Sequence, residues 1–271
     1  RRKPGRAGTT TRRESDTPRL ASGVTGGRTN GAPLLISFEN RDARRGDYAG
    51  LSETPRPGHA DFVAMTKYGG FADLSGGGHF SGRLTVGLVA AGVVAKKLIA
   101  PASVAARLLS TGGSDRIDEA VAAAQAAGDS IGGLVEGRAA GLPAGLGEPF
   151  FDSVESILSH LLFAIPGVKG VEFGAGFAAA AMPGSAYNDR YVDRDGRTET
   201  NHSGGINGGL TNGNDMVFRV AVRPPASIGL PGRHDACIAL RVPVIVESVA
   251  AVALADLMLL EQKVPRVWRS R

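Results

Sequence analysis

Glycine is the residue that most constrains how this chain can fold. The 271 residues include 39 glycines, about twice the usual share. The clusters are Gly76–Gly78, Gly204–Gly205, Gly208–Gly209 and the run 137–147. Glycine adopts backbone conformations closed to other residues and lets N–H groups approach a ligand, so such clusters predict loops. Each cluster alone is no more than a tight turn, but several of them beside arginines indicate an anion site.

The positive charge of the chain is concentrated at its start. Residues 1–20 hold seven Lys or Arg against Glu14 and Asp16, which accounts for the whole formal net charge of +5. A basic arm of this kind is typical of a solvated tail, of a nucleic-acid contact, or of a pocket for a small, multiply anionic ligand. The arm has no aromatic residue on which a base could stack, which disfavours nucleic acid.

Hydrophobic periodicity predicts two strands and four helices. The strands are expected at 32–40 and 215–223, the second alternating Met216, Phe218, Val220 and Val222 on one face. The helices are expected at 83–99, 115–127, 152–164 and 244–262. No linker divides the chain, so we expect one α+β domain over 1–271.

Two local patterns in the middle of the chain have structural interpretations. Asp152 with Glu155 three residues later is typical of a capping box at a helix start. His160, on the apolar stretch 157–164, is expected to be a packed core histidine.

Several other patterns bear on cofactors and location. Gly174 to Ala179 fits a dinucleotide fingerprint, but Pro183 and Gly184 end the following helix too soon for a Rossmann site. The single cysteine, Cys237, excludes an internal disulfide and is expected to be buried. No histidine has the spacing of a metal ligand set. The longest apolar run, 242–260, is interrupted by two acidic residues, so we expect a cytoplasmic protein without a membrane span.

The segment Arg-Pro-Gly-His-Ala-Asp, residues 56–61, raises a question that a turn does not answer. Proline and glycine explain a turn, but not His59 with Arg56 three residues before it and Asp61 two after. A histidine titrating near neutrality suits proton transfer. The alternative is a turn histidine that makes only a structural hydrogen bond.

A set of motifs in fixed order covers nearly the whole chain. They are RRKPG with TTTRRESD, SGVTGGRTNGAPL, RPGHADFVAMTKYG, GGGHFSGRLTVGLVAAGVVAKK, GDSIGG, GLPAGLGEPFFDSVES, IPGVKGVEFGAGF, NHSGGINGGLTNGNDMVFRVAVRPPASI and GRHDACIALRVPVIVES. This ordered set resembles the chorismate synthase family. The resemblance implies a β-α-β sandwich with helices packed between antiparallel sheets. It also implies a lyase that eliminates phosphate from 5-enolpyruvylshikimate 3-phosphate in the anti 1,4 sense, with reduced FMN as cofactor.

The resemblance also implies roles for particular residues. His59 would act as a proton donor near flavin N1, and Asp235 would work with flavin N5 in removing the ring C6 proton, held ionised by Arg233. The substrate carries two carboxylates and a phosphate, which arginines bind well; the implied substrate residues are Arg1, Arg2, Arg56, Arg83 and Arg233. The implied FMN residues are His79, Phe80, Ser81, Gly208, Arg223, Ser227 and Arg233. NADPH is a possible source of electrons for the flavin. The family forms homotetramers, and the apolar stretch 244–260 could supply buried contacts inside the subunit or between subunits.

The chain departs from the family pattern in several places. The family's N-terminal Gly-Glu-Ser-His-Gly segment does not occur here, so we expect a piece of a longer protein. The family usually has arginine at the place of His79, glutamate at Leu84 and lysine at Arg223, and the stretches 227–232 and 99–115 are short. Two alternatives to a lyase therefore stay open: a catalytically silent relative that binds an anionic ligand or acts as a scaffold, and an RNA-binding protein that uses the basic arm.

Overall fold

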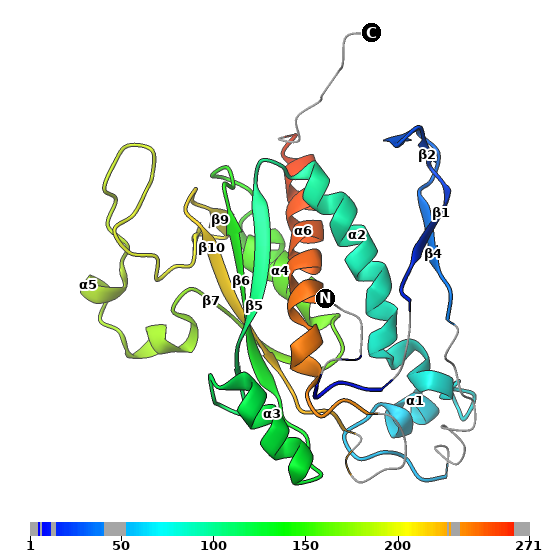
Figure 1. Cartoon of the computed structure of the whole chain (residues 1–271). Coiled ribbons are helices and arrows are strands. Elements are labelled where there is room, and N and C mark those ends of the chain that lie inside the picture. Colours follow the sequence, from blue (N-terminus) through cyan, green and yellow to red (C-terminus); the bar gives the residue numbers. More distant parts are fainter. Residues whose placement is uncertain are drawn as a thin grey trace.

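A four-stranded antiparallel sheet forms one layer of the protein. In the computed structural model, residues 5, 7–11, 15–40, 53–226, 228 and 234–262 are described. The sheet runs in the order β5 (Ser103–Thr111), β6 (Gly133–Ala140), β10 (Met216–Val222) and β7 (Val168–Phe173), and each neighbouring pair is antiparallel (Figure 1). β10 confirms the strand predicted at 215–223.

The centre of this sheet shows why one glycine cluster was misread. Met216, Phe218, Val220 and Val222 are all buried on one face of β10, as the alternation predicted. Gly137 lies in β6 opposite Phe218, where a Cβ would overlap the Phe218 ring. The run 137–147 therefore begins inside a strand. Its first glycine serves ring packing, and the prediction of a loop was wrong there.

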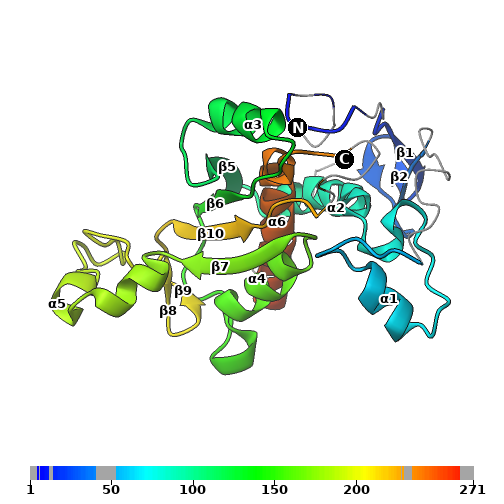
Figure 2. The ribbon, with the colours of Figure 1, turned by 90° about the horizontal axis from the view of Figure 1, so that it is seen from below.

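Three helices cover one face of the sheet. α6 (Pro243–Leu260) packs on β5 and β6, α4 (Val154–Phe163) packs on β7 and α6, and α2 (Thr85–Leu98) runs along α6 (Figure 2). α6 is apolar around most of its circumference, as expected of a helix enclosed by protein, and Glu247 and Asp256 are its two charged residues. Among the described helices it alone is long and apolar enough to cross a membrane, but most of it is buried in the core.

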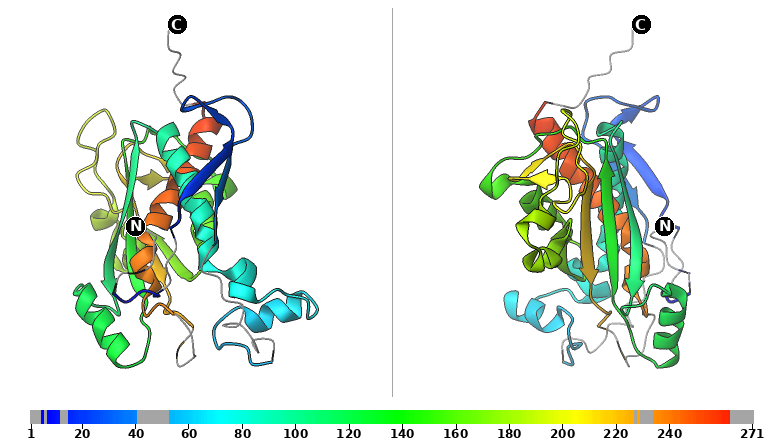
Figure 3. Two further views of the ribbon diagram at one scale, coloured as in Figure 1. Left: turned by 45° about the vertical axis from the view of Figure 1, so that its right-hand side comes forward. Right: turned by 90° about the vertical axis from the view of Figure 1, so that its left-hand side faces the viewer.

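A second, smaller sheet lies on the other side of the helices. It pairs β1 (Pro18–Ser22) with β4 (Leu35–Phe38) in antiparallel fashion (Figure 3). Residues of β4 and α2 line the same apolar hollow. The helices thus lie between antiparallel sheets, which confirms the expected α+β sandwich. β4 is shorter than the strand predicted at 32–40.

The remaining elements are short and lie around the sandwich. The helices are α1 (Asp61–Lys67), α3 (Ile117–Ala126) and α5 (Gly184–Tyr187), with 3₁₀ turns η2 (Ser75–Phe80), η3 (Gly82–Leu84), η4 (Phe150–Asp152), η5 (Gly176–Ala181) and η6 (Ile238–Arg241). The small strands are β2 (Val24–Thr25), β3 (Arg28–Thr29), β8 (Ile206–Asn207) and β9 (Leu210–Thr211). α2, α3, α4 and α6 confirm the four predicted helices within a few residues.

Two details of α4 differ from the sequence interpretation. Its N-cap is Ser153, whose hydroxyl accepts the Ser156 N–H at 3.1 Å, so the predicted cap at Asp152 was wrong by one residue. His160 is exposed, whereas Leu158 and Leu162 are buried. A residue two positions away from a buried leucine points to the opposite side of a helix, so His160 is not a core histidine.

Candidate active site

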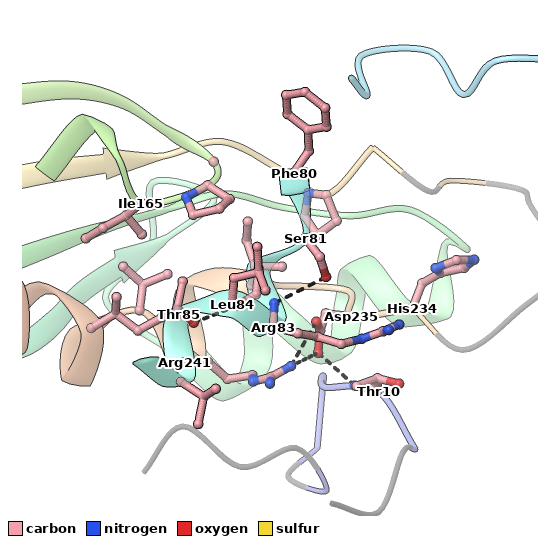
Figure 4. A pocket seen from close by; sticks show the side chains of 18 of the residues that line it. Thr10, Phe80, Ser81, Arg83, Leu84, Thr85, Ile165, His234, Asp235 and Arg241 are labelled. Atoms are coloured by element: carbon pink, nitrogen blue, oxygen red, sulfur yellow. Dashed lines mark hydrogen bonds and ion pairs between the residues drawn. The ribbon is translucent and has the colours of Figure 1, made fainter. Parts of the chain in front are cut away.

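A cavity of about 470 Å³ opens at one end of the sandwich. Its walls come from segments far apart in sequence: the turn before α1, the start of α2, the chain around 165–167, the residues after β10, and the chain around 234–245. The strands and helices of the core end here, so loops that are distant along the chain meet at one place. Figure 4 shows these segments and the side chains they contribute.

Asp235 is held by two donors at this cavity. The backbone N–H of Thr10 donates to Asp235 Oδ1 at 2.8 Å, and Arg241 Nη1 lies 3.3 Å from Oδ2 and 3.5 Å from Oδ1 (Figure 4). The Asp235 side chain is 15% exposed, so one part of the carboxylate still reaches the cavity that it lines. A carboxylate held in this way is fixed in position by charge and hydrogen bonds, and it can accept a proton.

His59 belongs to a second cluster, with Arg56 and Asp61. The turn is closed by the His59 N–H, which donates to the Arg56 carbonyl at 3.2 Å. The Asp61 side chain is fully buried and accepts from Arg56 Nε at 2.7 Å, from Arg56 Nη2 at 2.7 Å and from the Arg56 backbone N–H at 3.0 Å. His59 Nδ1 lies 2.6 Å from Asp61 Oδ1.

The charges of this cluster act on both titrating groups. Burial alone would raise the pKa of Asp61, but the hydrogen bonds from Arg56 and the charges of His59 and Arg56 lower it to about 2. Burial and the Arg56 charge lower the pKa of His59, Asp61 opposes them, and Arg223 adds to the lowering. His59 is therefore neutral near pH 7 in this state of the protein.

The cavity has a basic side and an apolar side. Arg83, Arg223 and His234 line it together with Arg241. Another part of its wall consists of apolar side chains, among them Phe80, Leu84 and Ile165 (Figure 4). Gly82 also borders the cavity, and a Cβ there would meet nothing within 4 Å. The arrangement suits a flat ring against the apolar side and anionic groups against the arginines.

Many of the residues singled out from the sequence meet at this cavity. His59, Phe80, Ser81, Arg83, Arg223 and Asp235 all line it. They come from positions up to 176 residues apart in the chain, His59 and Asp235 being the extremes.

Other expected site residues lie elsewhere. Arg56 is expected to grip substrate, but its guanidinium is committed to Asp61 behind His59, and its side chain is only 9% exposed. His79 is exposed at the end of η2, and Gly208 lies in the turn between β8 and β9; neither lines the cavity. Arg1, Arg2, Ser227 and Arg233 lie outside the described residues.

Three residues that contact Asp235 or His59 were not given this role from the sequence. Arg241 pairs with Asp235, which lies six residues before it, just ahead of the 3₁₀ turn η6, whereas Arg233, expected beside Asp235, lies outside the described residues. Thr10 contributes only a backbone N–H, which leaves no sequence signal. Asp61 was noticed beside His59, but without a role.

Cys237, expected to be buried, is fully buried, and burial raises the pKa of its thiol.

The fold and the cavity define an enzyme for a small, multiply anionic substrate. In the part of the chain that the structure describes, no three His, Cys, Asp or Glu side chains are placed to hold a metal ion. The fixed Asp235 carboxylate, His59 beside the buried Asp61, and the arginines are groups suited to proton transfer and anion binding, and they lie at one place.

Comparisons with known proteins identify the family. The family model described as chorismate synthase matches residues 1–232. The chain is 56% identical to a chorismate synthase of Chitinophaga pinensis, over all of this chain and 87% of the relative. It is 42% identical to one of Thermococcus kodakarensis, over 92% of this chain and 83% of the relative. This chain belongs to the chorismate synthase family.

A solved structure agrees with the sequence comparisons. A crystal structure of a chorismate synthase superimposes with a TM-score of 0.73 at 25% identity, and the match covers 90% of this chain and 78% of that one. Members of the family are carbon–oxygen lyases of aromatic amino acid biosynthesis that use a reduced flavin.

Proposed function

We propose that the cavity is the active site in which this chain releases phosphate from 5-enolpyruvylshikimate 3-phosphate to give chorismate. This is the reaction of the family, the last common step of the shikimate pathway. The observation that carries the proposal is the meeting of Asp235 and His59 in one cavity with Arg83, Arg223 and Arg241. The substrate has three anionic groups, and the cavity offers arginine side chains for them.

The arginines divide into two groups by what they contact. Arg83 and Arg223 line the cavity and are the described candidates for the substrate carboxylates and phosphate. Arg241 is shared with Asp235. Arg1, Arg2 and Arg233 remain predicted substrate ligands beyond the described part of the chain, whereas the commitment of Arg56 to Asp61 favours an indirect role for it.

The cavity also suits a reduced flavin, which we take to be FMN. Its apolar side can face a flat ring system, and the open Cβ position of Gly82 leaves room for a ring to approach. Phe80, Ser81 and Arg223 are the residues that would hold it, with His59 beside it. When bound, reduced flavin supplies the electron chemistry of the elimination and is not consumed overall.

Each proton-transfer residue has its own task in this proposal. Asp235, kept in place by Arg241 and Thr10, accepts the hydrogen that leaves ring C6 as a proton. His59 holds and moves a proton at the other cluster. The two groups have different hydrogen-bond partners, so each can be changed without removing a hydrogen bond of the other.

Wider properties of the protein follow from the family. We propose a single domain over 1–271, a cytoplasmic location, NADPH as a source of electrons for the flavin, and a homotetramer without nucleic-acid or membrane partners. Several large apolar side chains support assembly: Phe150, Phe151 and Phe177 are each more than 80% exposed, which is costly for a monomer.

Phosphate release tests the proposed function. The full-length protein, kept anaerobic with dithionite and FMN, is expected to release phosphate from 5-enolpyruvylshikimate 3-phosphate, and Asp235→Asn is expected to release it far more slowly. Absence of release from the wild type, with substrate still bound in equilibrium dialysis, would favour the catalytically silent relative. Salt-sensitive RNA binding without substrate binding would favour the RNA-binding alternative.

A further inference from the structure

The buried Asp61 carboxylate raises the question of which proton His59 carries and where. His59 Nδ1 has two close neighbours: Asp61 Oδ1 at 2.6 Å and Arg56 Nη2 at 3.0 Å. An imidazole nitrogen either donates or accepts, so Nδ1 can make only one of these hydrogen bonds. The two choices correspond to the two neutral tautomers of the ring.

Distance and charge decide between the tautomers. If Nδ1 carried a lone pair, that lone pair would face the carboxylate oxygen at 2.6 Å, which is repulsive in a buried site. If Nδ1 carries the proton, it donates a short, charge-assisted hydrogen bond to Asp61. Arg56 Nη2 already donates to the same oxygen at 2.7 Å, so it loses no partner by this choice.

We propose that Asp61 is a positioning residue for the reaction. Its buried carboxylate, held by Arg56, fixes His59 as the tautomer with its proton on Nδ1, so that Nε2 is the atom through which His59 exchanges protons with bound ligands. The identity of those ligands rests on the proposed function, whereas the tautomer does not.

The surroundings of His59 agree with this assignment. The side chain is 19% exposed and lines the cavity, and in the described segments Nε2 makes no hydrogen bond. Three charged groups act on the ring: Arg56 and Asp61 from its own segment and Arg223 from the end of β10. Burial, Arg56 and Arg223 lower the pKa of His59 and keep the ring neutral in the free protein, whereas Asp61 favours the imidazolium. An anionic ligand at Nε2 therefore promotes proton uptake there.

The asparagine variant at position 61 gives a specific expectation. In Asp61→Asn, an NH₂ group at the Oδ2 position would face two donors, the Arg56 backbone N–H and Nε–H. At the Oδ1 position it would face one donor, Arg56 Nη2, and could itself donate to His59 Nδ1. The second placement is the less costly, and it moves the ring proton of His59 to Nε2.

Nitrogen-15 NMR of the histidine rings tests the tautomer directly. The chain has five histidines, and His59→Gln identifies the signals of His59 in the full-length protein. The expected result for the wild type above neutral pH is a protonated Nδ1 and an unprotonated Nε2, exchanged in Asp61→Asn. The matched control is Asp189→Asn, because Asp189 lies 3.4 Å from His202 Nδ1 outside the cavity and should leave the His59 signals unchanged.

The wild-type spectrum decides the tautomer even if Asp61→Asn fails to fold. A wild-type His59 with its proton on Nε2 would overturn the inference. Failure of the proposed function is seen separately, since a wild type that releases no phosphate leaves the ring spectrum unaffected.

The pH dependence of turnover gives a second readout that a purely structural Asp61 would not move. Asp61 raises the pKa of His59, so its loss lowers that pKa. If protonated His59 is needed, the descending high-pH limb of kcat shifts to lower pH in Asp61→Asn, while KM for the substrate changes little. An unshifted limb, or a loss confined to KM, would overturn the inference.

Discussion

Arg241, the last residue of η6, has its Nη1 3.3 Å from Oδ2 of Asp235. Both side chains are mostly buried, at 17% and 15% exposed, so little solvent screens the pair. The Thr10 N–H also donates to this carboxylate, at 2.8 Å from Oδ1. The Asp235 carboxylate is therefore held in place by a residue six positions along the chain.

Removing that arginine is expected to impair turnover. Arg241→Gln should lower kcat/KM. The fall should correspond to a loss of about 1.5–3 kcal/mol of transition-state stabilisation, the range for a hydrogen bond to a charged group. Arg241→Lys should restore part of the lost kcat/KM. Arg107→Gln is the control, because Arg107 pairs with Glu136 at 2.9 Å on the exposed side of the sheet. Equal effects of Arg241→Gln and Arg107→Gln on phosphate release would contradict the role of Arg241.

The buried ion pair between α2 and α6 is expected to matter for stability. Lys96 Nζ lies 2.6 Å from Glu247 Oε1, and the Glu247 side chain is 3% exposed. Lys96→Met removes the Lys96 charge from beside that carboxylate and should reduce the free energy of unfolding by up to about 3 kcal/mol. The cost is less than for a fully buried pair because Lys96 is partly exposed. Urea unfolding measures this. Arg116→Ala breaks the exposed pair with Glu119 and should cost less than about 0.5 kcal/mol; a similar cost in both variants would refute the prediction.

The crossing of α2 and α6 depends on one glycine. A Cβ at Gly92 would overlap Ser248 of α6, including its backbone, whereas a Cβ at Gly87 of the same helix would meet nothing within 4 Å. Gly92→Ala should therefore reduce the free energy of unfolding by about 1–3 kcal/mol, which is seen as a lower midpoint of thermal unfolding. Gly87→Ala should leave stability unchanged or raise it by up to about 1 kcal/mol. The reverse order of the two variants would show that the helix crossing is looser than described.

The depressed pKa of Asp61 predicts a loss of stability in acid. Its folded-state pKa of about 2 lies below the ordinary 3.8, so the carboxylate contributes about 2 kcal/mol above pH 4, lost as the pH falls towards 2. The lowered pKa of His59 acts in the same direction below about pH 6.5, since the unfolded chain takes up that proton first. Urea unfolding of wild type and Asp61→Asn over this range should show a shallower pH dependence in the variant. Parallel curves would mean that Asp61 is not ionised in the fold.

Much of the fold could be predicted because apolar periodicity reports burial. The four long helices and β10 followed from it. β5 and β6 did not, because β6 contains Gly133 and Gly137 and reads as a loop until the ring of Phe218 is placed on it. The prediction that His160 lies in the core was wrong for a related reason, because apolar neighbours in sequence do not specify which face of the helix a residue occupies.

The site was predicted in part for a different reason. His59 and Asp235 stand out through family motifs, and the fold brings both to the cavity. The partners that orient them are set by packing that no local pattern records, as with the Thr10 backbone N–H. Arg56 shows where prediction from sequence stops. It belongs to a motif expected to bind substrate, but in the structure its guanidinium donates its hydrogen bonds to the buried Asp61 carboxylate.

The division of labour between Asp235 and His59 is tested most directly by a deuterium isotope effect on turnover. The measurement compares ordinary 5-enolpyruvylshikimate 3-phosphate with substrate deuterated at C6, under anaerobic conditions with reduced FMN. Asp235→Asn keeps the shape and loses the basicity, so turnover should fall by about 10²–10⁴-fold and the isotope effect should grow. His59→Ala should slow turnover without enlarging the isotope effect. Turnover of Asp235→Asn at the wild-type rate, or an enlarged effect in His59→Ala alone, would contradict the assignment of the C6 proton to Asp235.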